Sequence, residues 1–180
     1  MTQNDPSGQQ TFGTEEKPSW FAVQTKPRHE KRVYTDLRGK GIHSFLPLFH
    51  ERRQWSDRLQ WVETPVFSHY VFAQIPVGGE SRVRVLRTGG VVRLAGAPGF
   101  GTPVPDEQIE NLQAIVAQQI PMTPHEFIRI GEKVRIRGGA LNGIEGIVLA
   151  FKNDRNLVVS VDLIQKSIAI RIHGFEVDRI

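Results

Sequence analysis

Residues 131–146, GEKVRIRGGALNGIEG, place five glycines around one short segment near the C-terminus. Val134 and Ile136 alternate with charged residues, which predicts a strand with one buried face. The pair at 138–139 should end that strand, and Gly146 indicates a bulge or a tight corner where a small sheet curls over. Glycine-rich loops can also cradle phosphate, but no Gly-Lys-Ser/Thr sequence follows here, so the pattern disfavours a nucleotide site.

Short apolar segments separated by polar turns fill the rest of the C-terminal region. Several such segments in about 50 residues are typical of a small closed all-β barrel. The expected strands after the glycine-rich loop are residues 147–151, 157–163, 167–172 and 175–177.

The N-terminal region mixes helical and strand periodicities. A first helix is expected to begin at Pro27 and to end at Gly39 or Gly41, because proline suits the first helical position and glycine ends helices. A second helix is expected over residues 106–119, where apolar residues recur on one stripe. Two helices over a mixed sheet predict an α/β sandwich, an α+β fold. The expected strands are residues 20–25, a hairpin of 49–55 and 59–63, and a central strand over 66–75.

Composition divides the chain into segments. Residues 1–18 lack an apolar period and are expected to form a disordered tail. Two prolines indicate a linker over residues 119–127. We therefore expect an N-terminal domain over residues 19–118 and a C-terminal domain over residues 128–180.

Two groups of motifs resemble known families. The sequence GGALNGIEG at 138–146 resembles the KOW motif of transcription elongation factors and several ribosomal proteins. The segments WFAVQT at 20–25 and TPVFSHYVFA at 64–73 resemble the N-terminal NGN domain of the NusG family, and TGGV at 88–91 is a further match. The resemblance covers residues 19–180 in the family's order. It implies an NGN sandwich followed by an SH3-like KOW barrel.

The resemblance implies binding to RNA polymerase. In the NusG family this aromatic neighbourhood forms a depression that holds the coiled coil of the polymerase clamp, which implies that role for Trp20, Phe67, Tyr70 and Phe72. Such docking requires exposed apolar surface, whereas ordinary core is the simpler role for aromatic residues. Strict alternation sends Phe67 and Tyr70 to opposite faces unless the step between them is irregular. The family's Pro-Gly is replaced there by Ser-His at 68–69.

Two further contacts follow from the same resemblance. The polymerase gate loop is expected to contact Ser81, Arg82 and Val83. Residues 26–58 carry nine Lys or Arg against four acids, which favours a polyanionic partner, although a solvated helix face is the simpler interpretation. In specialised NusG paralogs the matching helix face lies toward the non-template DNA strand, which implies DNA binding by four cationic residues. These are Lys26, Arg28, Lys31 and Arg32.

The C-terminal domain is expected to recruit another partner. Leu141 and Ile144 lie in the loop where the family presents an apolar contact, and the partners implied are the termination factor Rho or a small-subunit ribosomal protein. The basic first helix and the Ser-His substitution lean toward a specialised antiterminator of the RfaH or UpxY type over the general factor. The alternative is a KOW-type RNA-binding or ribosome-associated protein, which would have no reason to carry a polymerase-docking aromatic strand.

Composition argues against several other classes. The chain has no cysteine, which excludes disulfides and thiolate metal sites. Its six histidines show no recognisable metal-ligand spacing, and no nucleophile elbow, Walker loop or dinucleotide fingerprint occurs. We therefore expect no enzyme activity, no cofactor and no bound metal. No 18-residue apolar run or signal peptide is present, so we expect no membrane contact. The absence of cysteine fits a cytoplasmic protein, and we expect a monomer.

Overall fold

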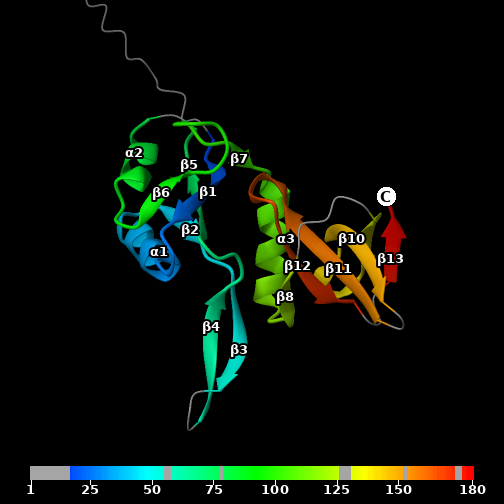
Figure 1. The fold of residues 1–180 in the computed structure, drawn as a ribbon. Coiled ribbons are helices and arrows are strands. Elements are labelled where there is room, and N and C mark those ends of the chain that lie inside the picture. The colour runs from blue at the N-terminus through cyan, green and yellow to red at the C-terminus, as the bar shows by residue number, and fades with distance from the viewer. Residues whose placement is uncertain (1–16, 55–57, 78, 126–130, 152–153, 173–175) are drawn as a thin grey trace, which may run out of the picture.

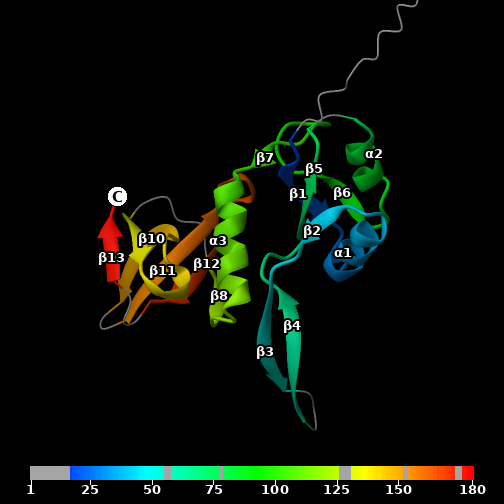
Figure 2. The same cartoon turned by 180° about the vertical axis from the view of Figure 1, so that it is seen from behind.

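The structure is a computed structural model that describes residues 17–54, 58–77, 79–125, 131–151, 154–172 and 176–180. It has an N-terminal α+β sandwich and a C-terminal antiparallel sheet. Helix α3 (Asp106–Ala117) stands between them in both views of the ribbon (Figure 1, Figure 2). This helix therefore has neighbours on two sides.

The N-terminal sheet is antiparallel throughout, in the order β2-β5-β1-β6, with β7 also pairing β1. The expectation of a mixed sheet is therefore wrong. Its strands are β1 (Ser19–Thr25), β2 (His43–Phe45), β5 (Tyr70–Ile75), β6 (Val91–Leu94) and β7 (Pro103–Val104). Its helices besides α3 are α1 (Glu30–Gly39) and α2 (Glu80–Leu86).

Alternation along β1 and β5 separates two apolar faces of this sheet. One face, which includes Phe21 and Val71, packs in a cluster with Leu37 of α1. The other face, which includes Phe72, packs in a second cluster with Leu112 of α3. The two helices therefore cover opposite faces of one sheet.

A two-stranded hairpin of β3 (Leu48–Gln54) and β4 (Leu59–Pro65) stands away from the sandwich (Figure 1, Figure 2). It confirms the hairpin predicted from the sequence. Because its outer part packs against neither sheet, its side chains are largely solvent-exposed.

The C-terminal strands form one antiparallel sheet in the order β13-β9-β10-β11-β12-β8. The prediction of a small all-β unit is confirmed, although among the described residues no pairing joins β13 to β8. The strands are β8 (Met122–His125), β9 (Glu132–Arg137), β10 (Glu145–Phe151), β11 (Asp154–Val161), β12 (Lys166–Arg171) and β13 (Glu176–Arg179), with two 3-10 turns, η1 (Gly139–Leu141) and η2 (Asp162–Ile164).

Several element boundaries differ from the sequence predictions. Helix α1 begins at Glu30 instead of Pro27, because Arg28 has a φ of 61° that cannot continue a helix. Strand β5 begins at Tyr70 for the same reason, since His69 has a φ of 72°. Strand β8 lies inside the expected linker and pairs with β12. Helix α2 has no counterpart among the predicted elements.

Candidate functional site

The structure brings the four predicted aromatic residues together on one face of the N-terminal sheet. Tyr70 and Phe72 are two residues apart on β5 and so share a face, and Phe72 lies opposite Ala22 of β1. Phe67 meets Phe72 edge to face, with 6.2 Å between the ring centroids. Trp20 belongs to the same apolar cluster, on which Tyr70 packs. These four residues, here called the aromatic cluster, share one face, although Trp20 lies at its far end, opposite Gln74 of β5.

The irregular step at Ser68-His69 places Phe67 on this face. His69 adopts a left-handed φ of 72°, and its backbone nitrogen donates a hydrogen bond to Glu30 Oε1 at 2.7 Å. Its carbonyl oxygen accepts a hydrogen bond from the backbone nitrogen of Thr25 at 2.8 Å. The turn is therefore held by both α1 and β1, and the chain reverses between Phe67 and the start of β5.

The expectation that this aromatic surface is exposed is wrong for three of its four residues. Trp20 is 5% exposed, Phe67 2% and Phe72 0%, whereas Tyr70 is half-buried. Burial results from α3, whose apolar residues belong to the same cluster, and from the C-terminal sheet beyond it. A helix and a sheet that are distant in sequence therefore cover the face.

A reciprocal pair of hydrogen bonds joins α3 to the C-terminal sheet. Gln108 Nε2 donates to Asp162 Oδ2 at 2.9 Å, and the backbone nitrogen of Asp162 donates to Gln108 Oε1 at 3.1 Å. A cleft of about 560 Å³ separates the segment that includes Phe67 from the loop that includes Gln165. The contact between the two halves is thus partly polar and imperfectly packed.

The predicted apolar contact of the C-terminal domain is also covered. Leu141 is 1% exposed and Ile144 is 3% exposed, and both belong to the cluster that contains Phe67. The turn that carries Leu141 contacts α3. The expectation of an apolar contact presented at the surface is therefore wrong in this conformation, because α3 occupies that side of the sheet.

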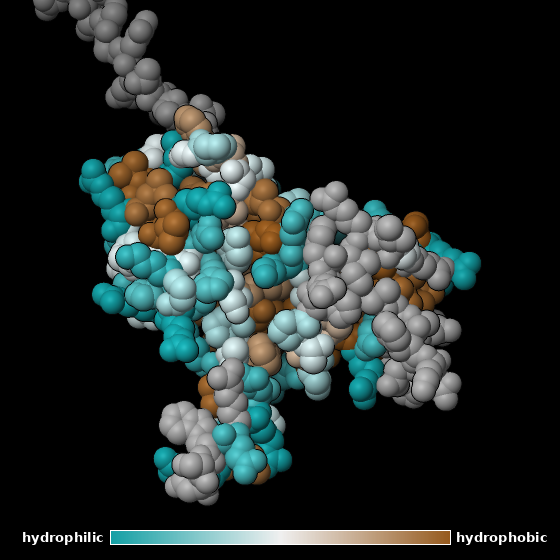
Figure 3. All heavy atoms as spheres, in the orientation of Figure 1, coloured by the Kyte–Doolittle hydropathy of each residue, from teal (hydrophilic) through white to brown (hydrophobic). Residues whose placement is uncertain are grey.

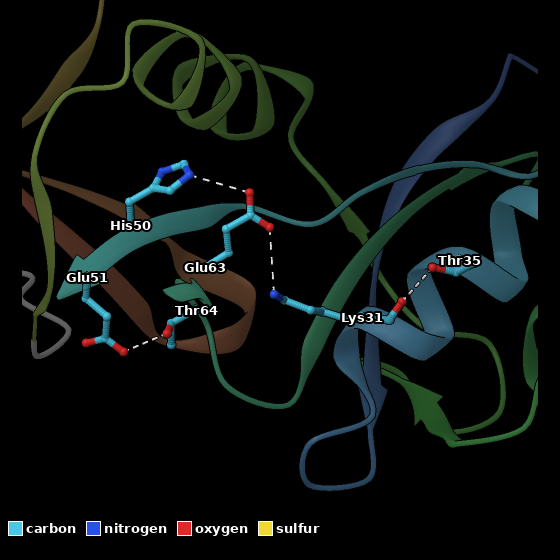
Figure 4. Close-up of polar contacts among 6 residues, drawn as sticks. All are labelled: Lys31, Thr35, His50, Glu51, Glu63 and Thr64. Carbon is cyan, nitrogen blue, oxygen red and sulfur yellow. Dashed lines mark hydrogen bonds and ion pairs between the residues drawn. The ribbon is translucent and has the colours of Figure 1, made fainter. Parts of the chain in front are cut away.

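The four predicted DNA-binding residues are exposed at the start of α1 and in the turn before it. Lys31 Nζ lies 3.7 Å from Glu63 Oε2, and Glu63 Oε1 lies 3.4 Å from His50 Nε2 (Figure 4). Arg32 Nε lies 3.8 Å from Asp36 on the same helix. The other two residues are Lys26 and Arg28. Lys31 thus connects the basic helix with the base of the hairpin.

The predicted gate-loop residues lie in the first turn of α2. Ser81 and Arg82 are half-buried, and the Arg82 guanidinium lies 4.8 Å from the centroid of the Phe100 ring. Val83 is exposed beside two further exposed apolar residues, and apolar surface gathers over α2 and β6 in Figure 3. Those two residues are Leu86 and Val92. An accessible apolar patch therefore adjoins the predicted segment.

Two exposed aromatic residues, Trp61 and Phe100, were not singled out from the sequence. Trp61 of β4 is 65% exposed, and the Arg52 guanidinium lies 5.6 Å from its ring centroid. The hairpin itself was predicted, and alternation groups Trp61 with Leu59 and Glu63. Alternation predicts which residues share a face. It does not predict whether that face is exposed to solvent or covered by a neighbouring element, so the exposure of Trp61 could not be predicted from the sequence.

Arg135 and Glu145 form a surface ion pair on neighbouring strands of the C-terminal sheet. The Glu145 carboxylate, which accepts a hydrogen bond from Arg135 Nε at 2.8 Å, raises the pKa of Arg135 above its ordinary value through that bond and its charge. No group of three or more His, Cys, Asp or Glu residues suited to a metal occurs within the described ranges. In the same ranges no helix is long and apolar enough to span a membrane.

Comparison with known proteins gives the family. Residues 18–113, more than half of the chain, match the family model described as transcription termination factor nusG. Two curated relatives carry the name transcription termination/antitermination protein NusG. That of Borreliella burgdorferi is 23% identical over 90% of this chain and 98% of its own length. That of Lactococcus lactis subsp. lactis is 22% identical over 89% of this chain and 92% of its own length.

A solved structure shares the fold. The structure titled "Domain interaction in Thermotoga maritima NusG" has a TM-score of 0.57 and 18% identity, and it covers 91% of this chain and 98% of that chain. The shared class is an α+β sandwich followed by a small antiparallel β unit. The chain belongs to the NusG family.

Proposed function

We propose that this chain is a non-catalytic transcription elongation and antitermination factor that acts in the cytoplasm as a monomer. It binds RNA polymerase through the N-terminal sandwich. The observation that carries the proposal is the placement of Trp20, Phe67, Tyr70 and Phe72 on one face of the sheet, with Phe67 and Tyr70 flanking the turn held by Glu30. Family membership and the family's transcriptional names support it.

The proposed mechanism uses binding energy alone. The aromatic cluster would hold the coiled coil of the polymerase clamp, and the α2 segment of Ser81, Arg82 and Val83 would contact the gate loop across the DNA cleft. A protein that binds the closed state of the enzyme more tightly than the open state raises the population of the closed state. Pausing and termination, which accompany opening, would then be suppressed.

Polymerase binding through this cluster requires the two halves of the chain to separate. Phe67 lines the cleft that faces the C-terminal sheet, so withdrawal of that sheet would widen access to it. The Gln108–Asp162 hydrogen bonds are surface contacts and oppose separation only weakly. The same movement would free Leu141 and Ile144 for Rho or a small-subunit ribosomal protein.

The basic face of α1 is the proposed contact for non-template DNA. Lys26, Arg28, Lys31 and Arg32 are exposed there, and phosphate contacts by Lys and Arg supply sequence-independent affinity. This face, together with the Ser68-His69 turn, favours a specialised antiterminator over the general factor. We propose further that residues 19–118 form the NGN domain, residues 119–127 the linker and residues 128–180 the KOW domain.

The polymerase contact is tested by binding of the full chain to core RNA polymerase and to an isolated clamp coiled coil. Tyr70→Ala should weaken binding to both. Tyr34→Ala is the matched control, because Tyr34 is also half-buried but packs on the opposite face of the sheet. Phe67→Ala is a poor probe, since Phe67 is 2% exposed and truncation of a buried Phe costs about 3–5 kcal/mol.

Two outcomes would contradict the proposal. Equal loss of polymerase binding in the two tyrosine variants would show that Tyr70 acts only through folding. Absence of polymerase binding, with affinity for RNA or ribosomal subunits, would establish the alternative of a KOW-type RNA-binding or ribosome-associated protein.

A further inference from the structure

One face of the hairpin carries an ordered series of cross-strand pairs. Residues opposite each other on β3 and β4 share a face, and successive pairs on that face lie about 7 Å apart. From the base outward the pairs are Leu48 with Pro65, His50 with Glu63, Arg52 with Trp61, and Gln54 with Leu59. Lys31 of α1 reaches the pair of His50 and Glu63 (Figure 4). The basic helix and the exposed tryptophan are therefore neighbours along one surface.

Trp61 also forms a wall of a cleft. The cleft has a volume of about 880 Å³ and lies between this hairpin face and the end of α3. Its far side includes Val116, Ile120 and Pro121, and its polar lining includes His50 and Glu63. A flat indole with a guanidinium over it, beside an apolar wall and polar groups, suits a planar ring whose edge carries hydrogen-bonding atoms.

Folding does not account for the exposure of Trp61. At 65% exposed it contributes little to either apolar cluster. The two strands are held by a backbone ladder that needs no indole. An exposed tryptophan on a projecting arm is instead typical of a residue that stacks on a ligand.

We propose that the Trp61–Arg52 pair is a base-stacking site for single-stranded DNA, which extends the phosphate-binding face of α1 along the hairpin. This rests on the DNA contact proposed for α1. A phosphate at Lys31 would place a neighbouring base of the same strand over Trp61, because the Glu63 pair that Lys31 contacts is one step, about 7 Å, from the Trp61 pair. Single-stranded DNA exposes the base faces that such a site needs, whereas the bases of a duplex are stacked on each other.

Charge supports a polyanion as the occupant. Lys31 is 53% exposed on its side chain and its ion pair with Glu63 is a surface contact, which exchanges readily for a phosphate. Arg52 lies beside the indole. Among the described contacts, Glu63 is the acidic residue next to Lys31. Removal of its negative charge should therefore strengthen binding of the DNA.

The test uses the full chain without polymerase, so that its result is independent of the polymerase contact. Binding of a fluorescent oligothymidylate of about twelve nucleotides, and of a duplex of equal length, is followed by anisotropy. We expect the single strand to bind more tightly than the duplex. Trp61→Ala should lower affinity for the single strand by about 5- to 100-fold, the change that loss of one stacked base produces. Leu59→Ala, an exposed apolar truncation on the same face, should remain close to wild type.

Salt dependence separates stacking from charge. Lys31→Ala should reduce the slope of log affinity against log salt by about 0.7, because one phosphate contact to a single strand is lost. Trp61→Ala should leave that slope unchanged, since stacking releases no counterion. Glu63→Gln should raise affinity. In NMR spectra, the indole N–H signal that is missing from Trp61→Phe should shift when the wild-type chain binds the oligonucleotide.

The proposal is overturned by any of three results. These are unchanged single-strand affinity in Trp61→Ala with its thermal stability intact, equal losses in Trp61→Ala and Leu59→Ala, or no oligonucleotide binding by the wild-type chain. If Trp61→Ala leaves oligonucleotide affinity unchanged but weakens binding in the separate polymerase assay, the hairpin is a protein contact, and the DNA proposal fails while the proposed function stands.

Discussion

Glu30 Oε1 accepts a hydrogen bond of 2.7 Å from the backbone nitrogen of His69, which ties the first turn of α1 to the turn before β5. Glu30 is 6% exposed, so this carboxylate is buried. The carbonyl of His69 in turn accepts from Thr25 at the end of β1. The turn that positions Phe67 and Tyr70 is therefore held from two separate elements.

Replacement of Glu30 tests this arrangement. Glu30→Ala should lower the free energy of unfolding by about 2 kcal/mol, because a partly buried backbone N–H loses a charged acceptor. Glu30→Gln should cost less, since its amide oxygen can still accept. Urea denaturation measures both. Asp36→Ala, on the same helix in an exposed ion pair, should change stability by less than about 0.5 kcal/mol, and a comparable loss there would refute a special role for Glu30.

The left-handed backbone conformation at His69 predicts that a glycine variant is more stable than a valine variant. Its φ of 72° lies in the left-handed region, which costs residues with a side chain roughly 1–2 kcal/mol. His69→Gly should be at least as stable as wild type, whereas His69→Val should be less stable by about 1–2 kcal/mol. Thermal unfolding of the two variants decides this. A less stable glycine variant would mean that the imidazole makes a larger contribution than the backbone strain.

The Gln108–Asp162 contact predicts how the two halves separate. Gln108→Ala removes both hydrogen bonds and should raise the open population by roughly 5- to 150-fold, given about 0.5–1.5 kcal/mol for each bond. NMR relaxation should then report faster and more independent tumbling of the N-terminal sandwich and the C-terminal sheet. Gln113→Ala on the same helix is the control. Identical tumbling in wild type and Gln108→Ala would show that other contacts hold the halves together.

Gly146 predicts a steric effect in the C-terminal sheet. A Cβ atom at this position would lie 2.6 Å from the carbonyl oxygen of Val158, so Gly146→Ala should destabilise the sheet by about 1–3 kcal/mol. Gly39→Ala is the matched control, because a Cβ atom there would meet nothing within 4 Å and alanine favours helices by up to about 1 kcal/mol. Denaturant midpoints of the two variants should therefore move in opposite directions.

In the glycine-rich segment, the local sequence pattern predicted the strand correctly and the bulge incorrectly. Alternation at Val134 and Ile136 correctly predicted a strand with a buried face. At Gly146 the expected bulge does not occur, because this residue pairs in register with Val134 inside β10. Its requirement for glycine comes from the close approach of β11, which is a tertiary contact. Local sequence predicted the element and could not predict that neighbour.

The candidate site divides in the same way. The aromatic and basic residues could be chosen from the sequence, and an irregular step before Tyr70 was a stated condition for grouping them. Helix α2 was missed because Glu80–Leu86 is short and mixes valine with arginine, so neither period dominates. The link between Gln108 and Asp162 joins residues far apart in the chain, which no single segment indicates.

Local sequence was enough to predict the class of fold, because strand alternation, helix stripes and turn residues act over a few neighbours. The residues at the candidate contacts were chosen from the family resemblance and stay a prediction. Local sequence could not predict which of those residues solvent can reach. Phe67 and Leu141 are covered because α3 and the C-terminal sheet pack over them, and Trp61 is exposed because the outer part of its hairpin packs on neither. The solvent accessibility of a residue depends on packing between segments that are distant in the chain. The periodicity within one segment does not predict that packing.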